Sequence, residues 1–313
     1  MTRLKKSLLA LAAMVTAALP VAAGTLATAA STSVPSFGHV FVIVGENKSL
    51  TQMTATPSRD PYITNTLKPA SAWFTRYDTR TTGSLAGYTT LTSGQYADCQ
   101  TRGPCGKFDV DNIFNQLGVG NWNAWMESMP SNCYPQTTGS ITAHNYYKNG
   151  HNPALYYTNL TGVPCNTGDI PTGTTLPDDM TAFNDALAAG TALPKYNIIS
   201  PNGCDSGYQT CTYNGVRMNP VKAFDNFLRR EIPLIQASPA YGSDSLIVVT
   251  FDEGQVGSTT PTSTMLAVTG PQVVPGTYDG YFDPYSILAT IQAGLGVPCL
   301  AGACSASVLP IFP

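Results

Sequence analysis

Ser245–Gly254, with the sequence S-L-I-V-V-T-F-D-E-G, is the stretch that decides the fold. Its apolar, β-branched run from Leu246 to Phe251 is typical of a strand that is buried on both faces. Two adjacent carboxylates, Asp252 and Glu253, and a glycine follow directly. Two neighbouring carboxylates repel each other, and in a chain with few charges that repulsion calls for a partner, of which a metal ion is the simplest.

A second stretch, His39–Asn47 (H-V-F-V-I-V-G-E-N), has the same form and ends in Glu46 and Asn47. In open α/β sheets ligands bind outside the carboxyl ends of the strands, so we expect both oxygen-rich pairs at one edge. Four such ligands would suit one divalent cation of the hard type, Mg²⁺, Ca²⁺ or Mn²⁺, with Zn²⁺ a further option. The alternative is ordinary turn chemistry, because Asp, Asn and Gly commonly follow strands.

The first 30 of the 313 residues have the pattern of a secretory signal peptide. Three basic residues precede an apolar run from Leu8 to Val21, and small residues offer cleavage sites at Ala23 and Ala30. The apolar run is too short for a confident membrane span. We therefore expect a secreted protein in which residues 31–313 form a single α/β domain with no integral membrane segment.

The remaining composition excludes some partners. Only 11% of the residues are charged, and the formal net charge is −3. No basic patch is present, so nucleic acid is not an expected partner. We expect a monomer that acts on a small molecule or a lipid.

Eight cysteines in a secreted chain indicate disulfides that close loops. The simplest connectivity joins neighbours in the sequence: Cys99–Cys105, Cys133–Cys165, Cys204–Cys211 and Cys299–Cys304. The sequence leaves other pairings open, because eight cysteines allow 105 of them. A zinc cluster is the poorer interpretation, since no C-x-x-C is present.

Alternating strand and helix signals predict a mostly parallel central sheet with helices on both faces. Strands are expected at 39–44, 121–127, 195–199, 245–251 and 264–269, and helices at 65–72, 84–94, 109–117, 181–188, 220–237 and 285–295. Asp109 or Asp111 would cap the third helix, and Pro233 would interrupt the fifth. Residues 130–178 form a long irregular segment, and such segments are often functional.

Ser84 is a candidate nucleophile. It follows a glycine and begins a predicted helix, where backbone N–H groups can hold an anion. The plain alternative is a serine that only caps the helix. A bound cation would polarise a phosphoryl oxygen and activate such a hydroxyl, so phosphate esters are the expected substrates.

Several motifs, in this order along the chain, resemble those of the bacterial and fungal phosphoesterases of the acid phosphatase and phospholipase C type, within the alkaline phosphatase superfamily. They are H-V-F-V-I-V-G-E-N-K-S, G-S-L-A-G-Y-T-T-L-T-S-G, H-N-P-A-L-Y-Y, S-P-N-G-C-D-S-G-Y, S-L-I-V-V-T-F-D-E-G and a closing Y-S-I-L-A-T-I. The resemblance implies that Glu46, Asn47, Asp252 and Glu253 bind the metal and that Ser84 is the nucleophile. It places His151 at the phosphate, and Asn152 beside it as a residue that binds substrate.

The chain also departs from the family pattern. The family's His-Pro before the serine is Thr82-Gly83 here, its Pro-Asn after the serine is Ala86-Gly87, and a closing histidine is Pro284. Tyr208 stands where the family has a histidine, with Gln209 at the family's Asp position. We expect Tyr208 to bind substrate as a hydrogen-bond donor, although a phenol is a poor acid near neutral pH.

Three histidines in the whole chain are too few for a His-rich site with two zinc ions. His39 begins its strand roughly 20 Å from Glu46, and His144 has no assigned role. The expected function is that of a secreted, metal-dependent acid phosphatase that acts through a phosphoserine intermediate. The alternatives are a phospholipase C-type phosphodiesterase and a weakened relative that binds a phosphorylated or glycan ligand. A Ser-His-Asp hydrolase would lack its G-x-S-x-G motif.

Overall fold

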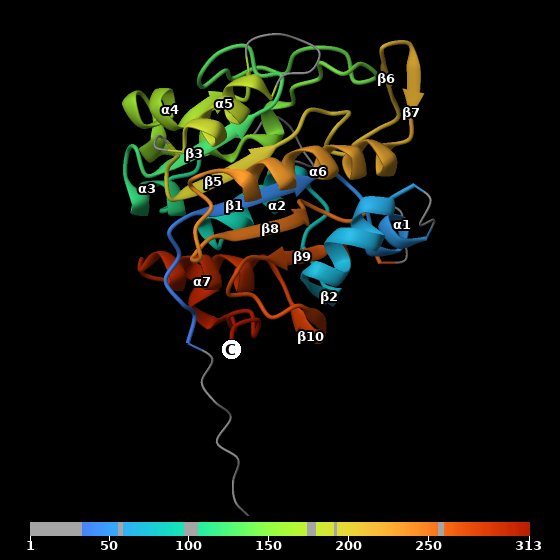
Figure 1. Cartoon of the computed structure of the whole chain (residues 1–313). Coiled ribbons are helices and arrows are strands. Elements are labelled where there is room, and N and C mark those ends of the chain that lie inside the picture. Colours follow the sequence, from blue (N-terminus) through green and yellow to red (C-terminus); the bar gives the residue numbers. More distant parts are fainter. Residues whose placement is uncertain (1–32, 56–58, 97–105, 174–179, 191–192, 256–259) are drawn as a thin grey trace, which may run out of the picture. The chain divides into compact units, whose positions relative to one another are not determined.

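The computed structural model describes residues 33–55, 59–96, 106–173, 180–190, 193–255 and 260–313 (Figure 1). The expected signal segment and the Cys99–Cys105 pair lie outside these residues. An eight-stranded sheet has the strand order β10-β2-β9-β8-β1-β5-β3-β4. β9 runs antiparallel to both of its neighbours, and the other neighbouring strands pair in parallel. The predicted mostly parallel α/β sheet is confirmed.

The strands of this sheet are β1 (Val40–Gly45), β2 (Ala72–Tyr77), β3 (Trp122–Met126), β4 (Asp169–Pro171), β5 (Tyr196–Ser200), β8 (Leu246–Phe251), β9 (Leu266–Thr269) and β10 (Gly276–Phe282). A separate antiparallel hairpin joins β6 (Cys211–Tyr213) and β7 (Val216–Met218). The helices are α1 (Leu50–Thr54), α2 (Ser84–Ser93), α3 (Ile113–Leu117), α4 (Val163–Gly168), α5 (Thr181–Ala189), α6 (Pro220–Ala237) and α7 (Pro284–Leu295).

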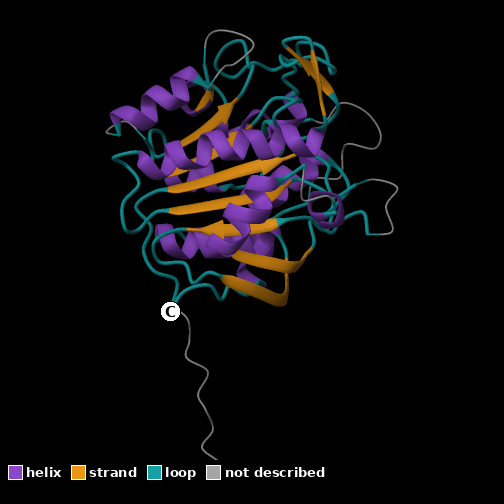
Figure 2. Ribbon diagram, turned by 45° about the vertical axis from the view of Figure 1, so that its right-hand side comes forward, coloured by secondary structure: helices purple, strands orange, loops and turns teal. Residues whose placement is uncertain are grey.

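Helices cover both faces of the sheet, as Figure 2 shows. Successive side chains of β1 point to opposite faces, so Val42 and Val44 enter one core and Phe41 and Ile43 the other. The first core also contains the apolar side chains of α2, α3 and α7, and the second those of α5 and α6. Both faces of β1 and β8 are therefore dry, which explains their continuous apolar sequences.

The register of the central strands places their ends together. Gly45 at the end of β1 pairs with Phe251 at the end of β8, and Ile43 pairs with Ile199 of β5 on the other side. The backbone N–H of Asp252 also donates to the carbonyl of Gly45 at 3.1 Å. The residues that follow β1 and β8 thus leave the sheet side by side.

Several local predictions were wrong. The third helix is shorter than expected and is capped by Asn112, whose side chain accepts from the backbone N–H of Asn115, rather than by Asp109 or Asp111. Pro233 lies inside α6 without ending it. The helix expected at 65–72 is a short π-helical and 3₁₀ segment that ends at Ala70, and β2 follows.

Three of the predicted disulfides are present: Cys133–Cys165, Cys204–Cys211 and Cys299–Cys304. They close loops of the described chain, as the spacing of the cysteines suggested. Among the helices that the structure describes, none combines the length and apolarity needed to cross a membrane.

Candidate active site

Three carboxylates meet at the carboxyl edge of β1 and β8. Glu46 follows β1, while Asp252 and Glu253 follow β8, and their exposed fractions are 0%, 1% and 3%. Asp252 is held in the turn because its Oδ1 accepts from the backbone N–H groups of Asn47 at 3.3 Å and Glu253 at 2.8 Å. Buried carboxylates need compensating charge or protons, so this edge is electrostatically unusual.

Asn47 joins the three carboxylates from a left-handed backbone conformation, with φ at 53°. Asparagine tolerates this region better than most residues do. The end of its side-chain amide lies 3.1 Å from Glu253 Oε1 and 3.3 Å from Asp252 Oδ1. In one orientation of the Asn47 amide, its nitrogen donates to both carboxylates. In the other orientation, its oxygen faces the two carboxylate oxygens, and a cation between the three oxygens would be needed to offset their repulsion.

Ser84 is the first residue of α2, and Gly83 occupies the cap position, so the serine does not cap the helix. Its hydroxyl is buried and donates to Glu253 Oε1 at 3.1 Å, with Glu46 Oε2 at 3.4 Å. Gly87 allows α2 to approach this closely, because a Cβ there would lie 2.0 Å from the carbonyl oxygen of Asp252. The serine and the carboxylates thus form one compact group.

Tyr88 and Ser200 support this group and were not predicted as site residues. The Tyr88 hydroxyl donates to Glu46 Oε1 at 2.9 Å and lies 2.9 Å from Ser200 Oγ. Tyr88 is one helical turn from Ser84, so the i, i+4 spacing on a site-facing helix is the signal that could have found it. Ser200 ends β5, the strand next to β1, and could have been found from its place at the same edge.

His151 enters the site from the long irregular segment. Its Nε2 lies 2.9 Å from Glu46 Oε2, and its ring stacks on Tyr88 with 6.0 Å between centroids. Tyr208 packs edge-on against it at 5.7 Å. The structure therefore places His151 next to Glu46, and Tyr208 next to His151.

Lys148 was not predicted, and it brings a positive charge to the site. Its Nζ lies 5.1 Å from the centre of the Tyr208 ring, a cation–π distance. Interaction with Glu46 helps to raise the pKa of Lys148, against the opposing effect of burial. A lysine three residues before His151, in a segment poor in charge, is the sequence signal that could have identified it.

Asn152 has a different place from the one predicted. Its side chain is fully buried, and its amide nitrogen donates to both carboxylate oxygens of Asp169, at 2.8 and 2.9 Å. The same nitrogen lies 3.1 Å from the hydroxyl of Tyr147. Because this nitrogen is already occupied, Asn152 anchors the segment that carries His151 rather than facing a ligand.

The other two histidines lie outside this group. His39 Nε2 is 3.3 Å from the carbonyl oxygen of Leu193, at the start of β1. His144 Nε2 is 3.1 Å from Asp205 Oδ1, and Arg230 contacts the second oxygen of that carboxylate at 3.1 Å. His144 therefore belongs to a separate buried charge cluster.

Burial shifts the pKa values of the site residues toward the uncharged form of each group. It raises the pKa of Glu46 to about 7 and, together with repulsion by Asp252, the pKa of Glu253 to about 8. Burial and the charge of Glu46 raise the pKa of Asp252 well above 3.8. Burial, and then Lys148, lower the pKa of His151 well below 6.5, so its imidazole is neutral. Without a cation, this group of carboxylates therefore favours bound protons.

The donor set fits a hard divalent cation. Glu46, Asn47, Asp252 and Glu253 offer only oxygen ligands once the Asn47 amide turns its oxygen inward. Glu253 Oε2 is buried without a hydrogen-bond partner among the described residues, which leaves it available as a ligand. Two tighter groups, Cys133–Cys165–Asp169 and His144–Cys204–Asp205, are poorer candidates because their cysteines are in disulfides.

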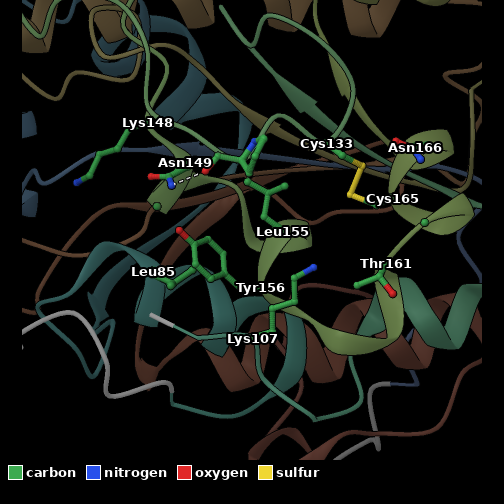
Figure 3. A pocket seen from close by; sticks show the side chains of 13 residues that line it. Leu85, Lys107, Cys133, Lys148, Asn149, Leu155, Tyr156, Thr161, Cys165 and Asn166 are labelled. Carbon is green, nitrogen blue, oxygen red and sulfur yellow. Dashed lines mark hydrogen bonds between the residues drawn. A yellow bond between two sulfur atoms is a disulfide. The ribbon is translucent and has the colours of Figure 1, made fainter. Parts of the chain in front are cut away.

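A pocket of about 690 Å³ adjoins the site (Figure 3). Its lining includes Leu85, next to Ser84, and Gly150, next to His151. The Cys133–Cys165 disulfide forms part of its wall. A ligand in this pocket would therefore reach toward the buried serine and histidine.

No protein-family model matches the chain. It is 26% identical over 183 residues to a phosphate-repressible acid phosphatase of Penicillium chrysogenum, covering 58% of this chain and 40% of that protein. It is 27% identical over 214 residues to an acid phosphatase of Aspergillus fumigatus, covering 65% and 43%. The matched segments thus span less than half of these two relatives. A phosphatidylinositol-3-phosphatase of Mycobacterium tuberculosis is 24% identical over 272 residues, covering 86% of this chain and 80% of that protein.

Solved structures show the same architecture. A Vibrio parahaemolyticus protein in the alkaline phosphatase superfamily matches with a TM-score of 0.61 at 12% identity, over 87% of this chain and 71% of the other. A phosphonate monoester hydrolase of Silicibacter pomeroyi matches with a TM-score of 0.52 at 12% identity, over 87% and 75%. The chain therefore has the alkaline-phosphatase-like α/β fold. Its resemblance to the fungal acid phosphatases is confirmed by the two fungal relatives.

Proposed function

We propose that this protein is a secreted, metal-dependent phosphoesterase that hydrolyses phosphomonoesters through a phosphoserine intermediate. The observation that carries the proposal is the position of the Ser84 hydroxyl, between Glu46 and Glu253 at the start of α2. The acid phosphatase and phosphatidylinositol-3-phosphatase names of its relatives support a phosphate monoester as substrate. The signal-like first 30 residues and the disulfides support secretion.

Ser84 is the proposed nucleophile. Its proton points to Glu253, which leaves a lone pair of the oxygen free to attack phosphorus. A bond from Ser84 Oγ to phosphorus forms as the ester P–O bond breaks, and water later releases inorganic phosphate from the serine. The N-terminal end of α2 favours the negative charge that gathers around the phosphoryl group.

Glu46, Asn47, Asp252 and Glu253 would hold the divalent cation. When bound, the cation would lower the pKa of the serine hydroxyl and neutralise charge on the phosphoryl oxygens. Tyr88 and the backbone N–H groups of the Asp252 turn fix the orientation of the carboxylates. These contacts keep the donor set in place before any ligand arrives.

His151 and Tyr208 would act on the phosphate. The neutral imidazole of His151 can donate an N–H hydrogen bond to a phosphoryl oxygen and so hold the phosphate, whereas only its protonated form could deliver a proton to the leaving oxygen. The Tyr208 hydroxyl, at the position of a histidine in the family, would donate a second hydrogen bond. Asn152 would act on substrate only through its neighbour, because its own amide nitrogen binds Asp169.

Hydrolysis of p-nitrophenyl phosphate and bis(p-nitrophenyl) phosphate tests the proposal. Wild type and Ser84→Ala are compared after chelation and after adding back Mg²⁺, Ca²⁺, Mn²⁺ or Zn²⁺, and Ser93→Ala, at the far end of α2, is the matched control. We expect activity that needs a metal, prefers the monoester and is lost only in Ser84→Ala. A preference for the diester would favour the phospholipase C-type alternative. Inactivity on both esters with every metal would refute the proposed phosphoesterase activity and favour the alternative of a weakened relative that binds a ligand.

A further inference from the structure

The pocket beside the candidate active site has an unusual charge. Two of its lining residues are lysines, Lys107 and Lys148, and none of its described lining residues is acidic. The chain as a whole carries a net charge of −3, so a pocket with two cations and no carboxylate differs from the average surface. Such a lining attracts anions and raises their local concentration.

The two lysines occupy different parts of the pocket. Lys148 lies toward the reaction centre, where it contacts the Tyr208 ring and interacts with Glu46. Lys107 is exposed and comes from the segment that leads to Phe108. Figure 3 shows the two lysines apart, with Leu85 and Tyr156 drawn between them.

This separation suits a substrate with two anionic groups. A phosphoryl group at Ser84 would lie near Lys148, and the remainder of the ester would extend along Leu85 and Tyr156. No described hydrogen-bond acceptor contacts Lys107, so its ammonium is available to a second anion. The pocket, at about 690 Å³, is in the range of small-molecule sites.

We propose that this pocket binds the leaving group and selects phosphomonoesters whose alcohol half carries a second anionic group, a phosphate or a carboxylate. Lys107 is the residue that recognises this second anion. The inference rests on the proposed phosphomonoesterase function and names the substrate class for the same site.

The direct test compares two esters that differ in one charge: 4-carboxyphenyl phosphate and its neutral analogue 4-carbamoylphenyl phosphate. The ionised carboxylate withdraws electrons from the leaving phenol less strongly than the carbamoyl group does, so a higher rate for the carboxylate ester cannot come from a better leaving group. We expect wild type to have a kcat/KM about five- to tenfold higher for the carboxylate, the effect of one charged contact at a partly exposed site. The preference should weaken as salt is added.

Lys107→Met should bring the ratio of the two kcat/KM values close to one, chiefly by lowering kcat/KM for the carboxylate ester. Lys195→Met is the matched control, because Lys195 is exposed just before β5, at the opposite edge of the sheet. It should keep the wild-type ratio. A ratio near one in wild type, or a ratio that Lys107→Met leaves intact, would overturn the inference while leaving the phosphomonoesterase function in place.

Binding provides a readout that does not depend on turnover. The probes are 4-carboxybenzylphosphonate and 4-carbamoylbenzylphosphonate, and the measurement is the rise in melting temperature at a fixed ligand concentration. The anionic probe should stabilise wild type more than the neutral probe does, and Lys107→Met should remove this difference. If neither ester were hydrolysed, the proposed function would be refuted. If the two probes raised the melting temperature equally, the proposal that the pocket binds a second anion would be refuted independently.

The second anion could belong to a soluble metabolite or to a lipid headgroup. Two further pairs separate these sources: fructose 1,6-bisphosphate against fructose 6-phosphate, and phosphatidylinositol 3-phosphate in phosphatidylcholine vesicles against its soluble headgroup. A Lys107-dependent preference for the bisphosphate supports a soluble substrate. A Lys107-dependent preference that appears only with vesicles supports a lipid substrate. If neither pair shows a Lys107-dependent preference, the inference is contradicted.

Discussion

Glu46→Gln should weaken the loss of stability that the metal-free protein undergoes as the pH rises. Glu46 is fully buried, and its pKa is raised from 4.5 to about 7. Each pKa unit corresponds to about 1.4 kcal/mol, so the fold disfavours the ionised carboxylate by about 3 kcal/mol. Glutamine keeps the shape and can still accept the Tyr88 hydrogen bond, but it carries no charge.

The sign of the effect follows from the order in which the unfolded and the folded protein lose the Glu46 proton as the pH rises. Below about pH 4.5 the carboxyl group is protonated in both states, and Glu46 has no effect on the pH dependence. Between about pH 4.5 and 7 the unfolded chain ionises first, so the stability of the metal-free protein falls as the pH rises. Above pH 7 this loss is complete. Glu253, whose pKa is raised to about 8, shifts stability in the same direction.

Urea unfolding in the presence of a chelator, at pH 4.5 and pH 8, measures the effect. The free energy of unfolding of Glu46→Gln relative to wild type should rise by about 3 kcal/mol between these pH values. Asp185→Asn, at an exposed position on α5, is the control, and its difference from wild type should change by less than about 0.5 kcal/mol. Adding a divalent cation at pH 8 should stabilise wild type more than Glu46→Gln. A mutant-to-wild-type difference that is the same at both pH values would refute the reasoning.

Three further changes test other parts of the account. Gly87→Ala should lower stability by about 2 kcal/mol or more and reduce p-nitrophenyl phosphate hydrolysis, because the added Cβ would lie 2.0 Å from the Asp252 carbonyl oxygen. Ala86→Gly is the control. A fully active Gly87→Ala variant would contradict the packing argument. Replacing Cys133 and Cys165 by serine opens a loop of sequence separation 32 and should lower the free energy of unfolding in urea by about 3–4 kcal/mol. A decrease of less than about 1 kcal/mol would contradict the proposed stabilising role of this disulfide. Tyr208→Phe should lower kcat/KM about fivefold through one lost hydrogen bond; unchanged kinetics would show that only the ring matters.

The sequence predicted the centre of the fold and the site because both depend on strong local patterns. β1 and β8 are buried on both faces, so their apolar runs are continuous and easily recognised. The oxygen-bearing pairs after them follow from the rule that ligands bind at the carboxyl edge of such sheets. Only the structure could show that Gly45 pairs with Phe251, since register depends on contacts between strands that are distant in sequence.

Other elements lacked such a pattern. β10 contains Gly276 and Gly280, is mostly exposed and pairs with one strand only, so it has neither a continuous apolar run nor a clear alternation. β2 was missed because its apolar start was interpreted as the end of the preceding helix. Both depend on tertiary pairing rather than on local preference.

The missing parts of the site are contacts between segments. The apolar spacing in α2 indicated a helix face, and nothing local showed that the Tyr88 hydroxyl would reach Glu46. Lys148 lies in an irregular segment, whose path over the sheet no periodicity predicts. Asn152 was assigned to substrate from the resemblance of its motif, whereas its buried amide nitrogen instead binds Asp169.

The most direct test of the central claim is to trap the proposed phosphoserine. The metal-loaded protein is mixed with a slight excess of p-nitrophenyl phosphate, quenched in acid within one turnover and analysed by peptide mass spectrometry. We predict one phosphoryl group on the peptide that contains Ser84, and none in Ser84→Ala. An active protein with no phosphorylated peptide, or a Ser84→Ala variant that keeps its activity, would contradict the account.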